Sequence, residues 1–237
     1  GQQWHIEDIL HWFNDYYLKC TYFDENGDML VNGGIITSTG TEQRSGGGGV
    51  AVSADTKFTM TGGNIVGCDS DKLGSGVYVS FGTFTMTGGE IANNTASTTV
   101  KNDGGGGVLL NSGSFTMSDG SITGNSVSGH NNSTGGGVYV NSGTFTMTNG
   151  VISNNDAPNG GGVTVFKGAE EGTSSFNLSG GNITGNSATE IGGGVYVASS
   201  FTLSGAPTIS NNTAGGAASN IYLNGSVITL TDALTNT

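Results

Sequence analysis

Short alternations of apolar and polar residues recur along the chain in a fixed order. A Val-x-Val pattern comes first, a Phe-x-Met or Phe-x-Leu pattern second, and a single Ile third. Alternation with a period of two residues is typical of a strand with one buried face. The copies begin at Val50, Val77, Val108, Val138, Val163, Val195 and Ile221; at Phe58, Phe84, Phe115, Phe145, Phe176, Phe201 and Ile228; and at Ile65, Ile91, Ile122, Ile152, Ile183 and Ile209.

The spacing of the copies predicts a solenoid. Successive Phe positions lie 26, 31, 30, 31 and 25 residues apart, with no crossover helix between them, and an earlier partial copy starts at Met29. A unit of three short strands cannot bury its apolar face alone, so successive units are expected to stack. The sequence predicts an all-β parallel β-helix with three strands per turn and roughly seven turns. Length variation should fall in outward loops at 93–104, 126–135 and 166–175.

An Asn stands three residues after most of the Ile positions, and Cys68 takes the same place in an earlier copy. Stacked amides can hydrogen-bond to one another and to the backbone of a corner. We expect a buried structural ladder here, and an Asn-lined ligand site is the alternative. The five residues are Asn94, Asn125, Asn155, Asn186 and Asn212.

The N-terminal segment carries the one helical pattern. Apolar residues between Ile6 and Tyr17 fall on a single stripe at 100° per residue. We predict that residues 1–22 form an amphipathic helix and entry segment that caps residues 23–237, a single β-helix domain; a partner-binding helix is the alternative. Cys20 and Cys68 either join cap and coil through a disulfide or remain thiols.

Composition narrows the possible partners. The net charge is −12 with only six Lys and Arg, which argues against nucleic acid and anionic membranes as natural partners. No apolar run is long enough to insert into a membrane. His5 and His11 are badly spaced for a helical metal pair, and residues 24–28 lack a full calcium-loop ligand set, so no metal or cofactor is expected. A low charged fraction, with abundant Asn, Ser and Thr, suggests an extracellular protein. A solenoid needs polar turns to cover its ends, and the sequence shows none, so we expect the chain to be part of a longer secreted protein.

The repeat resembles a known type of β-helix repeat. It reads GGGVYV, then GTFTMT, then an Ile with an Asn three residues later. It is similar to the right-handed β-helix repeats of large bacterial cell-surface proteins, including polymorphic outer-membrane adhesins, and to the pectate-lyase-like architecture. The resemblance covers residues 29–230. It implies a right-handed coil and a place on the bacterial surface or in the secreted fraction, whereas it says little about activity, because lyases, glycosidases and adhesins share this architecture.

Outward aromatic residues mark the predicted binding surface. The Val strands place four Tyr in one outward file, with two Phe near strand ends. Exposed aromatic files suit stacking on sugar rings, and apolar stripes mark interaction surfaces. We predict that these residues contact a glycan or a host or cell-surface protein; shielding of the sheet is the alternative. The six residues are Tyr78, Tyr139, Tyr196, Tyr222, Phe81 and Phe166.

Two other functions stay open as alternatives to non-catalytic adhesion or ligand binding. Glu90 and Asp119 are the carboxyl pair that falls on adjacent turns, as a glycoside hydrolase or polysaccharide lyase acting in a groove would need. A double file of hydroxyls, beginning with Thr59 and Thr61 and repeated on each Phe strand, is similar to the ice-binding face of some antifreeze solenoids. Solvent-facing Thr is also a common strand residue.

Overall fold

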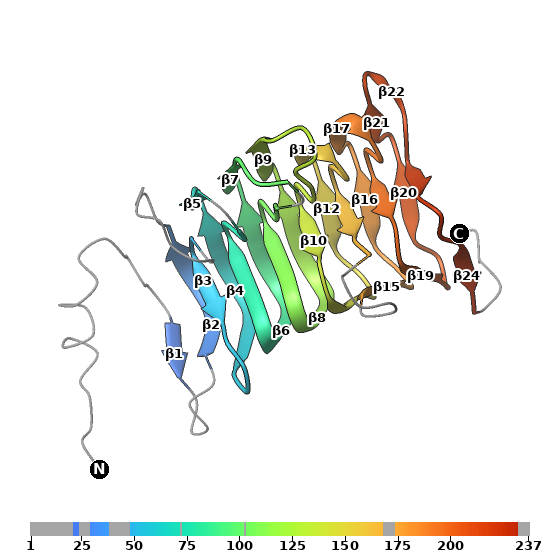
Figure 1. Cartoon of the computed structure of the whole chain (residues 1–237). Helices are drawn as coiled ribbons and strands as arrows, with labels where there is room; N and C mark the ends of the chain where they lie inside the picture. Colours follow the sequence, from blue (N-terminus) through green and yellow to red (C-terminus); the bar gives the residue numbers. More distant parts are fainter. Residues whose placement is uncertain are drawn as a thin grey trace, which may run out of the picture.

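The described part of the chain is an all-β parallel solenoid of about six turns (Figure 1). The structure, a computed structural model, describes residues 21–23, 29–37, 48–71, 73–101, 103–167 and 174–231. The expected seven turns become about six, because the described copies beginning at Met29 and Ile221 each complete only part of a turn. The described residues contain no helix; the predicted capping helix and Cys20 lie outside them.

Most strands belong to one 17-stranded sheet that wraps around the coil. Its first strands are β1 (Thr21–Phe23), β2 (Met29–Ile36), β3 (Val50–Val52), β4 (Lys57–Val66), β6 (Val77–Ala92), β8 (Val108–Thr123), β10 (Val138–Val140), β11 (Gly143–Met147) and β12 (Val151–Ser153). The rest are β14 (Val163–Val165), β15 (Ser174–Leu178), β16 (Asn182–Thr184), β18 (Val195–Val197), β19 (Ser200–Leu203), β20 (Thr208–Ser210), β23 (Ile221–Leu223) and β24 (Ile228–Leu230).

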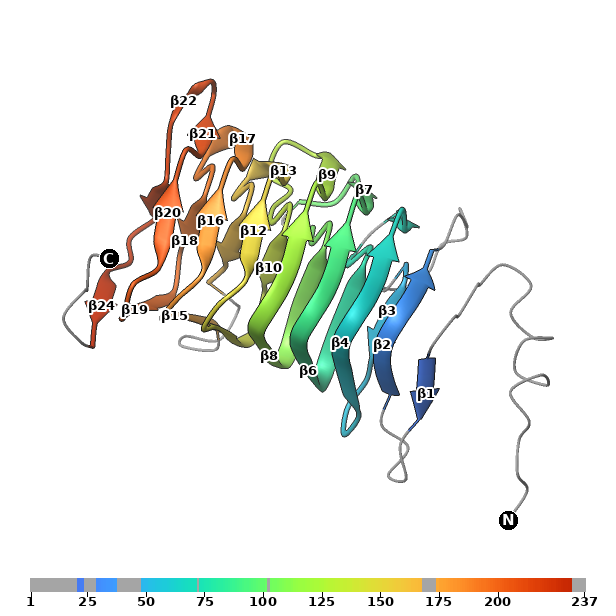
Figure 2. The same ribbon diagram turned by 180° about the vertical axis from the view of Figure 1, so that it is seen from behind.

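This sheet has three faces, which we call the Val, Phe and Ile faces after the repeat patterns that form them. Strands β6 and β8 run through all three faces without a break, whereas later turns use a separate strand for each. Pairing between turns is parallel and joins equivalent residues, for example Val138 to Val163 and Phe145 to Phe176. Figure 2 shows the Ile face, where the end of β8 lies beside β12 and then β16 and β20.

The interior is a continuous apolar core built from the three predicted patterns. Val138, Phe145 and Ile152 of one turn are all fully buried in it. The Phe rings stack along the axis from Phe58 to Phe201, with centroids 4.5 to 5.2 Å apart and nearly parallel planes. Because strands in a ladder lie about 4.8 Å apart, one ring per turn at the same register position stacks without strain. The alternation in the sequence therefore predicted the core correctly.

The Asn ladder is confirmed as a structural feature. All five amides are buried, and each side-chain oxygen accepts hydrogen bonds from the preceding turn. The Oδ1 of Asn155, for example, accepts from the backbone N and the Nδ2 of Asn125, both at 2.9 Å, while its Nδ2 donates to the carbonyl of Ile122 at 2.9 Å. The ladder starts at the backbone N of Cys68, which donates to Asn94 Oδ1 at 2.9 Å.

A fourth, shorter face lies between the Asn ladder and the Val face, and the sequence analysis did not predict it. Its strands form a 7-stranded sheet with a small separate core that contains Ala96, Val127 and Ala157. The loops expected at 93–104 and 126–135 therefore begin as strands. The members are β5 (Asp69–Ser70), β7 (Thr95–Thr98), β9 (Ser126–Gly129), β13 (Asp156–Asn159), β17 (Ser187–Ile191), β21 (Thr213–Ala214) and β22 (Ala217–Ala218).

The glycines before each Val strand have two distinct physical roles. Gly137 lies against the Asn ladder, and a Cβ there would meet Asn155 Nδ2 at 2.9 Å. Gly135 has a φ of 71°, and a Cβ there would lie 2.6 Å from the Cβ of Tyr139. The turn before the Val strand thus folds back over the outward side chain of that same strand.

Candidate binding site on the Val face

The outward file of the Val face has the order that the sequence predicted. Pairing between turns joins Tyr78 to Leu109, Leu109 to Tyr139, Tyr139 to Thr164, Thr164 to Tyr196 and Tyr196 to Tyr222. The members differ strongly in exposure. Tyr78 and Tyr196 are half-buried, Tyr222 is 39% exposed, and Leu109, Tyr139 and Thr164 are buried.

Tyr139 points away from the core but is covered, which was not expected for a ligand contact. It is 1% exposed, and the ring of Phe166 meets it edge-on with centroids 6.0 Å apart. Its hydroxyl donates to Asn141 Oδ1 at 3.1 Å. Burial, with a smaller contribution from Asp103, raises the pKa of Tyr139 well above its usual range. Tyr139 therefore supports Phe166 from beneath and does not offer a face to a ligand.

Tyr196 lies at the centre of the accessible part of the outward file of the Val face. Its ring stacks on that of Tyr222, with centroids 5.8 Å apart and planes 7° from parallel. Its hydroxyl oxygen accepts a hydrogen bond from Asn224 Nδ2 at 2.6 Å. Burial raises the pKa of Tyr196, and the hydrogen bond from Asn224 opposes that shift. The phenol is therefore neutral at physiological pH and keeps its proton for donation.

A small cavity of about 110 Å³, which we call the Tyr196 cavity, lies beside this ring. The residues facing it come from five separate segments of the chain that the solenoid brings to one place. Half of these residues are aromatic or apolar, and half carry an amide or a hydroxyl. The apolar and aromatic ones are Phe166, Ile191 and Tyr196, and the polar ones are Asn132, Thr134 and Asn159.

The polar residues of the Tyr196 cavity are held in place by pairing between turns. Thr134 and Asn159 form a parallel bridge, and Asn159 pairs with Ile191 of the next turn. The hydroxyl of Thr134 donates to that of Thr164 at 2.6 Å. Among the described residues, the Nδ2 of Asn159 makes only long hydrogen bonds, of 3.3 and 3.4 Å, to the carbonyls of Asn131 and Ser133. Strand pairing thus fixes the backbone at these residues, while the Asn159 amide is weakly engaged.

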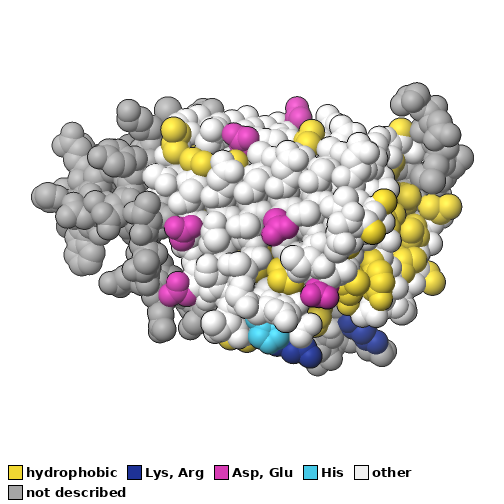
Figure 3. Space-filling view, turned by 90° about the horizontal axis from the view of Figure 1, so that it is seen from above, with side chains coloured by type: hydrophobic (Ala, Val, Ile, Leu, Met, Phe, Trp, Pro, Cys, Tyr) yellow, Lys and Arg dark blue, Asp and Glu magenta, His cyan; other side chains and the backbone are white. Residues whose placement is uncertain are grey.

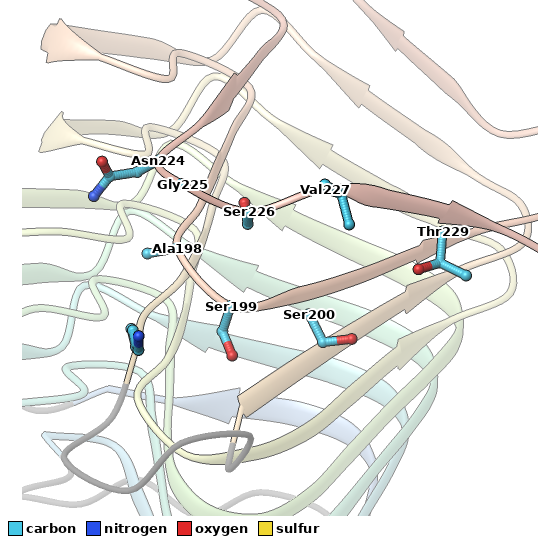
Figure 4. Close-up of a pocket in the computed structure, with 9 residues that line it drawn as sticks. Ala198, Ser199, Ser200, Asn224, Gly225, Ser226, Val227 and Thr229 are labelled. Carbon is cyan, nitrogen blue, oxygen red and sulfur yellow. The ribbon is translucent and has the colours of Figure 1, made fainter.

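A larger open hollow, which we call the corner groove, adjoins this cavity. It has a volume of about 600 Å³ and lies between the β18–β19 corner and the loop from β23 to β24 (Figure 4). The two spaces share a wall, because Asn224 lines the groove and bonds to Tyr196, while Lys167 of the groove directly follows Phe166 of the cavity. The groove is lined by Lys167, Ala198, Ser199, Ser200, Asn224, Gly225, Ser226, Val227 and Thr229.

The other predicted aromatic contacts lie apart from these hollows. Phe81 is 66% exposed and has a φ of 63°, which is rare for a bulky residue. Neither Phe81 nor Tyr78 lines the Tyr196 cavity or the corner groove. The structure thus brings Phe166 and Tyr196 together, places Tyr222 beside Tyr196 and Tyr139 against Phe166, and leaves Tyr78 and Phe81 outside this group.

The candidate catalytic carboxyls do not occupy equivalent positions on their turns. Glu90 pairs with Ser121, and Asp119 pairs with Thr87. Glu90 accepts a hydrogen bond from Asn64 Nδ2 at 3.5 Å, and Asp119 Oδ1 accepts from the backbone N of Gly120 at 2.8 Å. Each carboxylate is therefore engaged locally, and the two are offset along adjacent turns.

Of the expected double file of hydroxyls on the Phe face, one file is regular across the described turns. Pairing joins Thr59, Thr85, Thr116 and Thr146 in sequence, then Asn177 and Thr202. Parallel strands in such a ladder lie about 4.8 Å apart. The second file is broken, because the register shifts at Thr61 and Thr87, which pair with Gly88 and Asp119 and not with hydroxyl residues. The Phe face thus carries one ordered file of hydroxyls, interrupted at Asn177.

Sequence reasoning missed Asn132, Thr134, Asn159, Ile191 and Asn224. Asn132 and Thr134 belong to the loop expected at 126–135, no element was predicted for the other three, and no residue-type pattern distinguishes them. The available signal was the residue five positions after each Ile, usually a small one such as Ala157, which marks the fourth face and hence the path of the chain before the Val strand.

Neither a cluster of metal ligands nor a membrane-spanning helix occurs within the described ranges. No three His, Cys, Asp or Glu side chains there lie close enough together to hold a metal ion. No segment there forms a helix with the length and hydropathy required to cross a lipid bilayer. The chain shows no match to protein-family models, to curated proteins or to solved structures.

Proposed function

We propose that this chain is a non-catalytic, extracellular module of a bacterial surface protein that binds a glycan or a host protein. The observation that carries the proposal is the Tyr196 cavity, where aromatic rings and side-chain amides converge on a rigid coil. Concave sites with an apolar lining and a few oriented polar groups are typical binding sites. The right-handed coil and the adhesin-type repeat expected from the sequence are part of this proposal.

The surroundings of the cavity support binding rather than catalysis. The amides and hydroxyls of its lining donate and accept hydrogen bonds but do not titrate near neutral pH. The accessible Tyr222 extends the aromatic surface beside Tyr196. The net charge of −12 favours neutral ligands over polyanions, which the acidic coil would repel.

A glycan and host-protein array on three proteins tests the proposal. The wild type should bind at least one ligand on the array. Tyr196→Ala should weaken the affinity for that ligand by at least about tenfold, because the substitution removes both the stacking surface and the hydroxyl donor. Tyr78→Ala is the matched control, because it removes the same side chain from the same file outside the cavity. Equal binding by all three proteins would contradict the proposal. Cleavage products from a bound glycan would favour a carbohydrate-active enzyme. Their loss in Glu90→Gln or Asp119→Asn would assign the catalytic activity to the substituted carboxylate.

The regular Thr file on the Phe face supports ice binding as a second candidate. Its four Thr positions from β4 to β11 are in register without a bulge at those residues. Thermal hysteresis of the wild type, reduced in Thr116→Lys, would support it. Thr56→Lys, at an exposed residue before β4, is the control. Absence of hysteresis in the wild type rejects this candidate and leaves the binding proposal unaffected.

A further inference from the structure

The lining of the Tyr196 cavity combines apolar side chains with amides, and this combination suggests what it binds. Phe166 and Ile191 supply apolar surface, and Asn132 and Asn159 supply amides. Ile191 pairs with Asn159 of the preceding turn, so the two kinds of surface lie next to each other. A ligand group that fills the cavity must therefore carry a methyl or methylene surface beside an amide or comparable hydrogen-bonding group.

The size of the cavity limits the group further. Its volume of about 110 Å³ is about four times the volume per molecule of liquid water. The hollow is partly open, so it suits a substituent of about four non-hydrogen atoms that reaches in from a ligand lying mostly outside. The acetamido group of an N-acetylated sugar has that size and carries a methyl group beside an amide.

We infer that the Tyr196 cavity binds the acetamido group of an N-acetylated sugar, an inference that rests on the proposed function. The methyl group packs against Phe166 and Ile191. The acetamido N–H and carbonyl exchange hydrogen bonds with the Asn159 and Asn132 amides. Long hydrogen bonds of 3.3 and 3.4 Å leave the Asn159 Nδ2 able to turn to a better acceptor.

The remainder of the sugar lies outside the cavity. Tyr196 accepts a hydrogen bond from Asn224, and among the described residues its hydroxyl donates none, so its proton is available to a ring hydroxyl. The stacked rings of Tyr196 and Tyr222 offer an apolar surface to the C–H groups of a ring. The corner groove, of about 600 Å³ against 110 Å³ for the cavity, has room for an adjoining sugar unit. In Figure 4, Ser199 and Ser200 lie on one side of that groove and Val227 and Thr229 on the other.

Calorimetric titration of the full chain with two matched trisaccharides tests the inference. The probes are the β-linked trimers of N-acetylglucosamine and of glucose, which differ in the acetamido group. The acetylated trimer should bind at least about tenfold more tightly. Asn159→Ala should remove most of that difference and leave the affinity for the glucose trimer unchanged. Asn64→Ala, on the far corner of the coil, is the control and should change neither affinity. Sialyllactose and lactose, which differ by a whole sialic acid, form a second pair, and preference for sialyllactose that depends on Asn159 would assign the acetamido group to a sialic acid.

The possible failures are distinguishable. Equal affinities for the acetylated and unacetylated probes, both lost in Tyr196→Ala, would overturn the acetamido assignment and keep the proposed function. An acetyl preference that persists in Asn159→Ala would also overturn it. If no saccharide binds, and Tyr196→Ala changes nothing on the arrays, both proposals are wrong. Far-ultraviolet circular dichroism and thermal melting of each variant show whether it is folded.

Discussion

At the corner that follows each Ile, one residue in every turn adopts a left-handed conformation. Along the coil this position alternates between Gly and Asn, with φ between 54° and 67° throughout. A Cβ at Gly124 would lie 2.5 Å from Asn93 Oδ1, and one at Gly185 would lie 2.8 Å from Asn154 Oδ1. The Asn of one turn therefore lies over the Gly of the next, and the corner repeats every two turns.

This corner leads to a prediction that separates backbone strain from crowding. Gly124→Ala should lower the free energy of unfolding by about 1–2 kcal/mol, because an L-residue at this φ is strained. Gly124→Asn should cost less, although Asn is larger, because Asn tolerates the left-handed region. Urea denaturation measures both. A larger cost for Asn than for Ala would show that contact with Asn93 dominates, and Asn93→Gly combined with Gly124→Asn should then restore stability.

Burial of a phenol makes a second residue unusually sensitive to alkali. The pKa of Tyr139 is raised above the ordinary value of about 10, chiefly by burial. Above about pH 10 the unfolded chain loses this proton while the folded chain keeps it, so stability should fall by up to about 1.4 kcal/mol per pH unit. Tyr139→Phe should make that fall shallower, and the exposed Tyr222→Phe should not. Thermal melts between pH 8 and 11 provide the measurement, and identical slopes in all three proteins would contradict it.

The same residue shows where the sequence pattern ceases to be informative. Alternation correctly placed Val138 in the core and Tyr139 outside it, because the two sides of a strand are fixed by a period of two. It did not reveal that Tyr139 is 1% exposed. Its cover comes from Phe166 and from the turn at Gly135, and both contacts depend on how neighbouring turns stack, which no local pattern encodes.

At the scale of elements, the Asn ladder adds hydrogen bonds between successive turns to those that strand pairing already makes. Asn155 joins three turns, because it accepts from Asn125 and donates to the carbonyl of Ile122 and to Asn186 Oδ1. Removal of its side chain leaves the Asn125 backbone N buried without an acceptor, at about 1–3 kcal/mol, and takes one of two acceptors from Asn125 Nδ2, which keeps its hydrogen bond to the carbonyl of Ile91.

Asn155→Ala should therefore lower the free energy of unfolding by about 2–5 kcal/mol. Asn64→Ala is the matched control, because that amide is only part-buried and its one hydrogen bond, to Glu90, is 3.5 Å long. It should cost less than about 0.5 kcal/mol. Denaturant melts of the two variants give the comparison, and similar costs would mean that the ladder is not a principal source of stability.

The elements that the sequence revealed are those with large inward side chains. Each Phe or Ile strand repeats a bulky apolar residue at a constant offset, so its column is visible without a structure. The fourth face repeats mainly a small residue, such as Ala157 or Ala188, on strands of two to five residues. Small side chains occur in turns as readily as in strands, so periodicity carried too little information there, and the polar residues of the Tyr196 cavity went unrecognised with it.

For the whole molecule, the two ends of the described coil are built differently. At the first end, β1 pairs antiparallel with β2. At the other end, β21 and β22 form an antiparallel pair on the fourth face, whereas β23 and β24 each pair, among the described strands, only with the preceding turn. Leu223, Val227 and Leu230 are exposed there, and apolar side chains gather at that end in Figure 3. The repeat predicted stacking, but it could not predict that the last copy lies at the edge of the core.

This difference predicts a gradient of stability along the coil, because each turn of a solenoid is stabilised only by its neighbours. Amide hydrogen exchange should be slowest in the middle of β8 and in β11, which are paired on both sides, and fastest in β20, β23 and β24.

One column of Leu residues provides an independent measure, since Leu178 pairs with Leu203 and Leu203 with Leu230. Leu178 is 1% exposed and Leu230 is 59% exposed. Leu178→Ala should therefore cost about 2–5 kcal/mol and Leu230→Ala less than about 1 kcal/mol. Uniform exchange along the chain, or equal costs at the two Leu positions, would mean that the last turn is covered in solution and belongs to the core.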